Sequence, residues 1–251
     1  MIAMSKSTKK TGSMISLSAH TGGLPDGSAG NNPDTWVVIP LFNEAEVIGE
    51  VISGLRESFA NIVCIDDGST DGSGEIALER GARLVRHPIN LGQGAALQTG
   101  FDYALERGAK FVVTFDADGQ HRVVDAARMV ERARQEDLAI VVGSRFLDDR
   151  TQPGALKKIV LKTAVWVTNL GTHMKLTDAH NGLRVIREDA LRRIELRQDR
   201  MAHGTEIVVQ LGRTQLPWAE EPVEVLYTDY SRAKGQSLMN SINILIDLVI
   251  R

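Results

Sequence analysis

Two aspartates separated by a single residue follow an apolar run in the stretch FVVTFDADGQH, residues 111–121. Asp116 and Asp118 can face one cavity only if the backbone turns behind them, and Gly119 permits that turn. Two like charges held this close need a cation or a shared proton. Mg²⁺ is a suitable cation, because it binds one or two carboxylates and completes its shell with phosphate oxygens. With Gln120 as a further oxygen ligand, the stretch predicts a metal site.

Two simpler interpretations of these acids were compared with a metal site. An aspartate at the end of a strand often caps the next helix, but capping does not explain a second carboxylate and a glutamine. A calcium loop of the EF-hand type has its glycine at position 6 and a glutamate at position 12. Here the glycine falls at position 4, and position 12 is Ala127.

A second acid pair lies in the stretch IDDGSTDGSGE, residues 65–75. Asp71 is well placed to cap the helix that follows. Of the adjacent Asp66 and Asp67, only one can cap the turn, so we expect the other to point into a cleft. There it would accept hydrogen bonds from ribose hydroxyls or from a base N–H group.

A competing interpretation comes from the stretch LGQGAALQTGF, in which Gly92 and Gly94 open a helical segment. This resembles the start of a dinucleotide-binding fingerprint, with Asp116 at a suitable distance to hold a ribose. The match is poor, because Leu97 replaces the third glycine and three residues separate the preceding strand from the loop. It also leaves Asp118 without a role.

The elements that must position these acids are short apolar runs. Each run is separated from the next by a segment with one helix-like stretch, which is the spacing of strand–helix–strand crossovers. We therefore predict an α/β fold with a mostly parallel sheet covered on both faces, and a ligand site beyond the carboxyl ends of the strands. The predicted strands are 36–41, 61–66, 82–87, 110–115 and 138–144.

Composition excludes several classes of protein. The 251 residues are 43% hydrophobic and 24% charged, as in an ordinary globular domain. The net charge is −3, from 29 basic and 32 acidic residues. The protein therefore has no overall positive potential that would attract nucleic acid, and we expect no nucleic-acid partner. The single cysteine, Cys64, lies in an apolar run and predicts a buried, reduced thiol in a reducing compartment.

The two ends of the chain differ from its centre. Residues 1–34 carry lysines, Ser, Thr, Gly and Pro without the apolar core of a signal peptide, so we predict a disordered tail. Residues 236–251 have apolar side chains at helical spacing and predict an amphipathic C-terminal helix, which either packs on the core or docks at a membrane. Residues 155–170 form a second amphipathic candidate. No run is long enough to span a membrane.

Seven motifs in order resemble the family-2 glycosyltransferases of the GT-A fold, which has a Rossmann-like, mostly parallel sheet flanked by helices. The resemblance covers about Trp36 to Asn240 and predicts one such domain over residues 35–235. It is strongest to the branch of dolichol-phosphate mannose synthases and bacterial polyprenyl-phosphate sugar transferases. The motifs are VVIPLFNE, CIDDGSTDGS, NLGQGAALQTGF, FDADGQH, VVGSRF, DAHNGLRVIRED and YSRAKGQSL.

The resemblance implies a set of residues that bind the nucleotide sugar. It places the first loop on the nucleotide, the second acid pair beside base and ribose, and the DxD pair with Gln120 on the metal, Mg²⁺ or Mn²⁺. Phe42 stands where many members have Tyr. The implied donor residues are Pro40, Phe42, Glu44, Asp66, Asp67, Asp116, Ala117, Asp118 and Arg145.

The resemblance also implies residues that act on the acceptor and the leaving group. Leu183 replaces a phenylalanine of the acceptor motif, and Leu238 stands where some relatives have a lysine, so Lys234 would have to substitute. From its helical context, Glu206 is either a base or a residue that orients an arginine. The six histidines form no set with metal-ligand spacing, and His121 is the one nearest the acid pair. The catalytic candidates are Asp116, Asp118, Arg145, Asp178, Arg184, Glu206, Arg232 and Lys234.

The function that follows is metal-dependent transfer of a hexose from a GDP- or UDP-linked sugar to a polyprenyl phosphate, with inversion. Such an enzyme would act at the cytoplasmic face of the membrane, alone or with a small membrane protein, in glycan or cell-envelope polysaccharide synthesis. A transferase with a saccharide hydroxyl as acceptor is the nearest alternative. A non-catalytic module that binds sugar nucleotides or a membrane is an alternative of another class.

Overall fold

The computed structural model describes residues 32–147, 174–198 and 202–226. Within these ranges the chain forms one seven-stranded sheet with helices on both faces, which confirms the predicted α/β fold. The strands are β1 (Thr35–Leu41), β2 (Asn61–Asp66), β3 (Arg83–Arg86), β4 (Phe111–Thr114), β5 (Ile140–Ser144), β6 (Arg184–Arg187) and β7 (Trp218–Pro222). The helices are α1 (Ile48–Arg56), α2 (Ser73–Glu79), α3 (Gln93–Glu106), α4 (Val123–Gln135), α6 (Glu188–Leu191) and α7 (Ala202–Arg213).

The order of the strands in the sheet is β3-β2-β1-β4-β6-β5-β7. All strands run in one direction except β6, which is antiparallel to both of its neighbours, β4 and β5. The five predicted strands all form, within a residue or a few of the predicted ends. Strands β6 and β7 were not predicted from the sequence, and the reversed strand β6 lies between β4 and β5, beside the candidate site.

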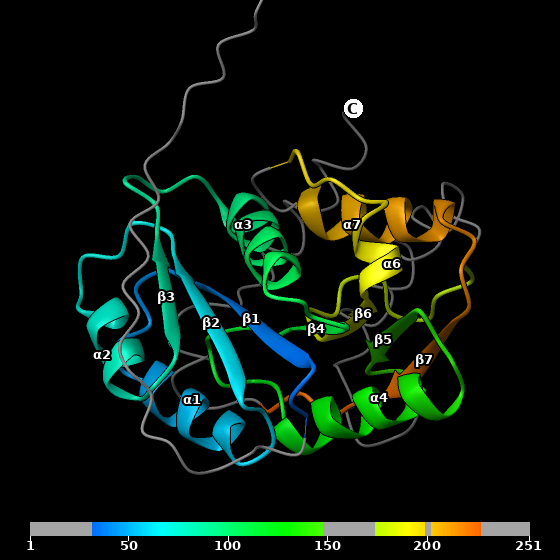
Figure 1. Ribbon diagram of the computed structural model, residues 1–251, viewed down its shortest axis with the longest axis horizontal. Helices are drawn as coiled ribbons and strands as arrows, with labels where there is room; N and C mark the ends of the chain where they lie inside the picture. The colour runs from blue at the N-terminus through cyan, green and yellow to red at the C-terminus, as the bar shows by residue number, and fades with distance from the viewer. Residues whose placement is uncertain (1–31, 148–173, 199–201, 227–251) are drawn as a thin grey trace, which may run out of the picture.

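Two apolar layers hold the sheet between its helices (Figure 1). Helices α1, α2 and α4 pack on one face, and α3, α6 and α7 pack on the other. Alternate strand residues face opposite layers, so Val38 and Val63 belong to one core and Val37 and Cys64 to the other. The strands are apolar on both sides, as a sheet covered on both faces requires. Cys64 is fully buried, as predicted.

The predicted boundary of the N-terminal tail is placed slightly too late. Asn32 is buried, and its side-chain amide donates a hydrogen bond of 3.0 Å to the carbonyl oxygen of Ser58. Arg134 on α4 contacts both Asn32 and Asp34, so residues 32–34 are part of the domain. The rest of the predicted tail, the segment 155–170, the C-terminal segment 236–251, Arg232 and Lys234 lie outside the described residues. Among the helices that are described, none has the length and apolarity to cross a membrane.

Candidate active site

The reversed strand β6 brings two distant motifs to one edge of the sheet. Because β6 is antiparallel, its amino end lies beside the carboxyl ends of β4 and β5, and Arg184 pairs with both Thr114 and Val142. The hydroxyl of Thr114 donates a 2.6 Å hydrogen bond to the carbonyl oxygen of Gly182. The segment that precedes β6, which contains Asp178, and Arg184 at the start of β6 therefore lie near the loop that carries the DxD pair.

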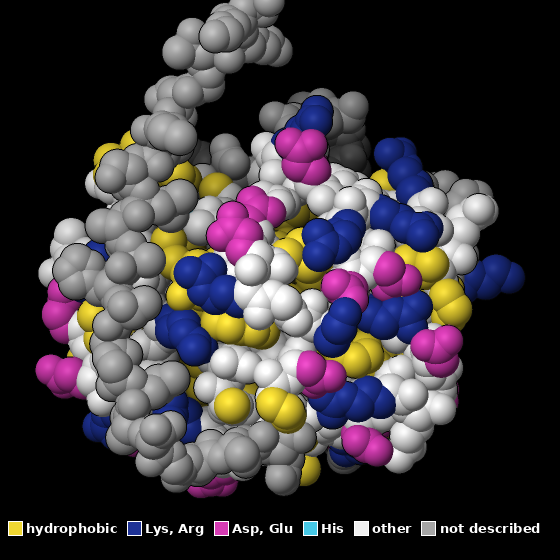
Figure 2. Space-filling model, viewed as in Figure 1, with side chains coloured by type: hydrophobic (Ala, Val, Ile, Leu, Met, Phe, Trp, Pro, Cys, Tyr) yellow, Lys and Arg dark blue, Asp and Glu magenta, His cyan; other side chains and the backbone are white. Residues whose placement is uncertain are grey.

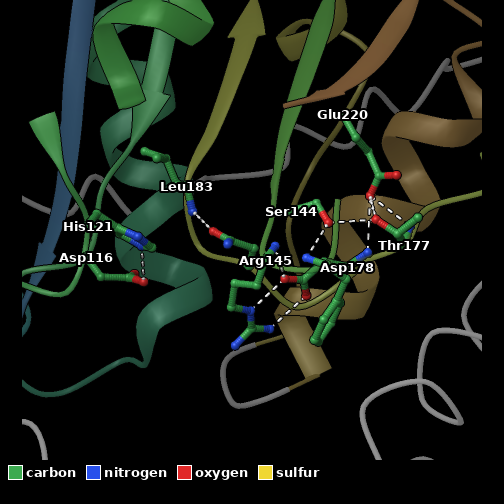
Figure 3. Close-up of polar contacts among 10 residues, drawn as sticks. Asp116, His121, Ser144, Arg145, Thr177, Asp178, Leu183 and Glu220 are labelled. Carbon is green, nitrogen blue, oxygen red and sulfur yellow. Dashed lines mark hydrogen bonds and ion pairs between the residues drawn. The ribbon is translucent and has the colours of Figure 1, made fainter. Parts of the chain in front are cut away.

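Asp116 contacts side chains from two parts of the chain. His121 Nε2 lies 2.8 Å from its Oδ2 (Figure 3), and Gln93 Nε2 donates to its Oδ1 at 3.3 Å. Burial alone would raise the pKa of Asp116, but the hydrogen bond and charge of His121 and the charges of Arg184 and His203 together lower it. Asp116 is therefore held as a carboxylate in a defined orientation.

Asp118 experiences the opposite electrostatic environment. Burial and the negative charges of Asp116 and Glu44 raise the pKa of Asp118 to about 6, although the backbone N–H of Gln120 donates to its Oδ1 at 3.0 Å. The negative charges of Asp116 and Glu44 thus act on Asp118 near the ends of β1 and β4. A bound cation would favour the ionised form of Asp118.

The glycine of the acceptor motif gives Asp116 its space. A Cβ atom built on Gly182 would lie 2.1 Å from Asp116 Oδ2, far closer than non-bonded atoms approach. Gly182 is therefore needed for the carboxylate to occupy its position. The sequence analysis included this residue in a motif but gave it no role, because only the pairing of β6 with β4 places it beside Asp116.

Arg145 and Asp178 form a two-point ion pair where β5 ends (Figure 3). Arg145 Nε and Nη2 lie 2.6 and 2.7 Å from the two oxygens of Asp178, and the backbone N–H of Arg145 donates at 3.1 Å. Asp178 is 1% exposed; burial alone would raise its pKa, but the charge and hydrogen bonds of Arg145 lower it. Asp178 therefore positions Arg145 and is not itself open to a substrate.

A carboxylate that the sequence analysis did not consider supports this pair from β7. Glu220 accepts hydrogen bonds from the backbone N–H groups of Thr177 and Asp178, at 2.8 and 3.1 Å. The hydroxyl groups of Ser144 and Thr177 lie 2.6 Å apart and join the end of β5 to the same segment. The loop before β6 is thus held by residues of both β5 and β7.

Arg184 is a buried cation between the two clusters. It is 3% exposed, and burial lowers its pKa to about 10 although Asp116 and Asp178 oppose that shift. Its Nε atom has no hydrogen-bond partner among the described residues. An arginine with an unpaired nitrogen is ready to bind an anion.

Both residues of the second acid pair, Asp66 and Asp67, are buried and accept hydrogen bonds within the domain. The expectation that one of them points into the cleft and binds the base or ribose stays a prediction. Asp66 accepts from the backbone N–H of Ser69, at 2.9 Å, and caps its own turn. Asp67 Oδ1 lies 2.7 Å from His87 Nδ1 and 2.8 Å from the N–H of Leu91, while its Oδ2 accepts from Gly92 at 2.8 Å. Its observed task is to hold the loop between β3 and α3.

The residues of the first loop lie at the carboxyl end of β1, and their binding of the donor stays a prediction. Glu44 is half-buried, its backbone N–H donates to Ser73 Oγ at 2.8 Å, and its charge raises the pKa of Asp118. Phe42 is exposed, and Pro40 pairs with Ile65 of β2. Ala117 is buried between the two acids of the DxD pair, and Gln120 is buried beside them.

The contacts of Glu206 among the described residues are mainly to backbone. Its two oxygens accept hydrogen bonds from the backbone N–H groups of Arg197, at 3.1 and 3.2 Å, and of Gln198, at 2.9 Å. Gln210 on the same helix donates a further bond of 3.2 Å. These bonds give the carboxylate a structural role, and the two roles considered for it, a base or a residue that orients an arginine, stay predictions.

No protein cage for a metal exists within the described part of the chain. No group of three or more His, Cys, Asp or Glu side chains there is arranged to hold an ion. Asp116 and Asp118 alone offer two carboxylates, which fits the coordination of Mg²⁺, since this ion commonly takes one or two protein carboxylates and completes its shell with substrate phosphates and water.

Comparison with known proteins identifies the family. The profile described as Glycosyl transferase family 2 matches residues 36–194. The chain belongs to this family. It is 30% identical to the UDP-N-acetylglucosamine–dolichyl-phosphate N-acetylglucosaminyltransferase of Methanococcus voltae, over 86% of this chain and 94% of that protein. It is likewise 30% identical to the undecaprenyl-phosphate mannosyltransferase of Micrococcus luteus, over 81% of this chain and 86% of that protein.

These relatives place this glycosyltransferase in the polyprenyl-phosphate branch that the motifs indicated. Among solved structures, glucosyl-3-phosphoglycerate synthase from Mycobacterium tuberculosis, in complex with Mn²⁺, UDP-glucose and phosphoglyceric acid, superposes with a TM-score of 0.61. The two sequences are 17% identical, and the match covers 85% of this chain and 79% of the synthase. This likeness therefore shows only that the two proteins share a fold.

Proposed function

We propose that this glycosyltransferase moves a hexose from a nucleotide sugar to a polyprenyl phosphate, with a divalent metal and inversion at the anomeric carbon. The observation that carries the proposal is the meeting of the DxD pair with Arg184 at one edge of the sheet, an arrangement of acids and cation suited to a diphosphate and a second phosphate. The names of two relatives, which act on dolichyl and undecaprenyl phosphate, support the class of acceptor.

The donor would lie over the ends of β1, β2 and β4. Glu44 is the best-placed residue for a ribose, because it is half-buried and close enough to Asp118 to raise its pKa. Phe42, Pro40 and Ala117 would form the walls. Asp66 and Asp67 remain candidates for the base only through the lone pairs that their internal hydrogen bonds leave open. These residues are compatible with either GDP or UDP as the nucleotide of the donor.

The residues present fit a divalent metal. Asp116 and Asp118 would hold Mg²⁺ or Mn²⁺ by their carboxylates, with Gln120 as a third protein contact. The bound ion would supply positive charge to the leaving diphosphate. The complexes of the M. tuberculosis synthase with Mn²⁺ are consistent with this choice of ion.

The reaction itself can be written without a protein base. An oxygen of the acceptor phosphate monoester, already ionised at neutral pH, forms a bond to the anomeric carbon from the face opposite the leaving group. The bond from that carbon to the diphosphate oxygen breaks, and the nucleoside diphosphate leaves with the electron pair. Attack from the opposite face inverts the configuration, and no proton has to be transferred.

The cations needed for this reaction lie beside the acid pair. Arg184 can bind the incoming phosphate through its unpaired Nε, and Asp178 holds Arg145 beside it. Arg232 and Lys234 are predicted to close over the diphosphate. A hydroxyl acceptor would need a base. Because the oxygens of Glu206 bond to backbone N–H groups, its geometry favours the phosphate acceptor over the saccharide alternative.

The site of action would be the cytoplasmic face of a membrane, where a polyprenyl phosphate presents its headgroup. The membrane surface, with or without a small membrane protein, would then be the partner of the enzyme. The expected pathway role is glycan or cell-envelope polysaccharide synthesis.

The proposal is tested by supplying labelled GDP- and UDP-sugars with polyprenyl phosphate or with free saccharides. Label is expected in the lipid product, with the anomeric configuration inverted by NMR, and excess EDTA should abolish transfer. Asp118→Asn should lower the rate about 100-fold, as loss of one group that stabilises developing charge typically does. Asp102→Asn alters an exposed acid on α3 and is the control, because it should leave the rate of transfer unchanged. Label on saccharide alone, or full activity in EDTA, would overturn the proposal.

A further inference from the structure

Large apolar side chains are exposed at one edge of the molecule. Six such residues are exposed within the described ranges, from 37% for Leu91 to 64% for Ile89. We call them the apolar rim: Phe42, Ile89, Leu91, Val124, Leu147 and Leu226.

Every member of the apolar rim follows the carboxyl end of a strand. Phe42 follows β1, Ile89 and Leu91 lie between β3 and α3, and Val124 is in the first turn of α4, after β4. Leu147 and Leu226 follow β5 and β7. Single exposed apolar residues are normal on soluble proteins. Here, within the described ranges, the opposite edge of the sheet has no exposed large apolar residue, and the one rim residue on a helix, Val124, lies in the first turn of α4, so the distribution is one-sided.

The apolar rim surrounds the candidate active site, which opens at the same carboxyl edge. Asp67 fixes the backbone N–H of Leu91 at 2.8 Å, and Leu226 donates its N–H to the carbonyl oxygen of Gln120 at 2.9 Å. The backbone of the rim is thus held in place at these two points while the side chains point outward. Figure 2 shows apolar side chains at the upper left margin, where Figure 1 draws the loop between β3 and α3.

Packing inside the domain does not account for these side chains. The two cores are built from other residues, and Ile89 leaves most of its surface in water. Exposed apolar surface gathered on one side of a protein is typical of an interaction site, since it is costly in water and gains free energy when covered.

We propose that the apolar rim is the surface that rests on a lipid bilayer, so that the carboxyl edge of the sheet faces the membrane. The inference rests on the proposed function, because a lipid phosphate in the bilayer interface can reach Arg184 only if this edge is turned toward it. Side chains of loops at such an interface enter about 5–10 Å into the boundary between headgroups and acyl chains.

The single cysteine permits a direct test in the full chain. Cys64 is fully buried, so a thiol-reactive environment-sensitive dye should label only an introduced cysteine. Ile89→Cys places the dye on the apolar rim. Glu106→Cys is the matched control, because it lies at the far end of α3 with its side chain 77% exposed. On vesicles of phosphatidylcholine and phosphatidylglycerol, the dye at position 89 should shift to the blue, and the dye at position 106 should not.

A second variant separates this inference from the proposed function. Replacing Ile89 and Leu91 together by Ser should reduce binding to these vesicles and transfer to vesicle-bound polyprenyl phosphate. It should leave transfer to a short, water-soluble prenyl phosphate unchanged, since neither side chain belongs to the site.

Three results would overturn the inference. The first is an equal response, or no response, of both dyes on these vesicles. The second is a response that requires native membranes with their proteins, which would indicate a protein partner. The third is a Ser variant that binds vesicles as well as the unmodified chain. A chain that fails to transfer sugar even to the soluble acceptor would instead overturn the proposed function.

Discussion

At the scale of single residues, the site depends on how Asp116 is held. Its two oxygens contact His121 and Gln93, residues that come from different parts of the chain. Its pKa is lowered while that of Asp118 is raised to about 6, so adjacent acids of one motif have different electrostatic environments. The two acids of the DxD motif are therefore not equivalent, because their neighbours shift their pKa values in opposite directions.

Gly182 offers the sharpest test of this arrangement. In Gly182→Ala the new methyl group would lie 2.1 Å from Asp116 Oδ2, so the carboxylate must move. We expect Mn²⁺ affinity in the presence of nucleotide to fall roughly 10–100-fold, the usual effect of disturbing residues that orient a metal ligand. Isothermal titration calorimetry measures this directly.

The control for that substitution is Gly54→Ala on α1. There the added Cβ would have only Val123 Cγ2 nearby, at 3.6 Å, which is ordinary contact. Alanine is the better helix former, so stability should rise by about 0.5–1 kcal/mol and metal affinity should not change. Equal metal affinity in the Gly182 variant and the unmodified chain would contradict the role given to Gly182.

Asp178 gives a prediction about pH. Burial opposes ionisation, but Arg145 outweighs it and lowers the pKa of Asp178 in the folded chain. The pair therefore stabilises the fold above the pKa of an unfolded Asp, about 3.9, and this stabilisation is lost as pH falls through the lower folded pKa. Asp178→Asn should be less stable than the unmodified chain at pH 7, and the difference should shrink in acid. Urea unfolding at several pH values measures it, and a difference independent of pH would contradict it.

At the scale of secondary-structure elements, two connections build the site. The reversed strand β6 carries the acceptor motif to the DxD loop, and the loop between β3 and α3 carries Gln93 to Asp116. Asp67 holds this second loop through His87, and His87 Nε2 in turn lies 3.0 Å from Thr99 Oγ1 on α3. A carboxylate that looks like a substrate ligand in the sequence thus ties β2, β3 and α3 together.

Asp67→Asn should therefore destabilise the fold. An amide cannot accept from both Leu91 and Gly92 and from His87, so one buried donor loses its partner at a cost of about 1–3 kcal/mol. Urea unfolding should show this loss. Glu44→Ala is the contrasting variant, expected to weaken binding of the nucleotide sugar with little loss of stability. Weaker nucleotide binding in Asp67→Asn, with unchanged stability, would restore Asp67 as a donor ligand.

At the scale of the whole molecule, the sheet with its two apolar layers is the rigid support and the carboxyl edge is the working surface. The acid pair, Arg184 and the apolar rim all belong to that edge. Side chains of both charge signs are spread over the face that Figure 2 shows. Helix α4 is joined to β7 by the ion pairs of Arg128 and Arg132 with Glu221. The buried sheet and its helices therefore stabilise the fold, and the carboxyl edge is the surface proposed to bind substrates and the membrane.

The reactivity of the Cys64 thiol can be used to measure how readily the central sheet opens. It lies in β2, fully buried, and burial together with Asp66 raises the pKa of its thiol. Because the thiolate is the reactive form, native protein should react with a thiol reagent only when the sheet opens. The labelling rate should rise steeply with urea, in parallel with unfolding measured by circular dichroism. Fast labelling without denaturant would contradict the rigid core described here.

The sequence by itself determined the class of fold, five of the strands and the family, and it predicted the chemistry-bearing residues. It could do so because buried parallel strands are continuous apolar runs, and because the family motifs follow one another in order along the chain. Local pattern is enough to propose residues that directly follow a strand, such as Asp116, Asp118 and Glu44.

Only the tertiary structure decided the contacts between elements that are distant in the sequence. Strand β6 is four residues long and opens with a buried arginine, so no periodic pattern marks it, and its reversed direction depends on pairing with β4 and β5. The roles of Gly182, Asp67 and Glu206 follow from neighbours 8 to 66 positions away along the chain. An Asp or Glu in a sequence can bind a substrate or a backbone N–H group, and the residue type is the same in both cases. Only the packing around the side chain shows which of these two roles it has.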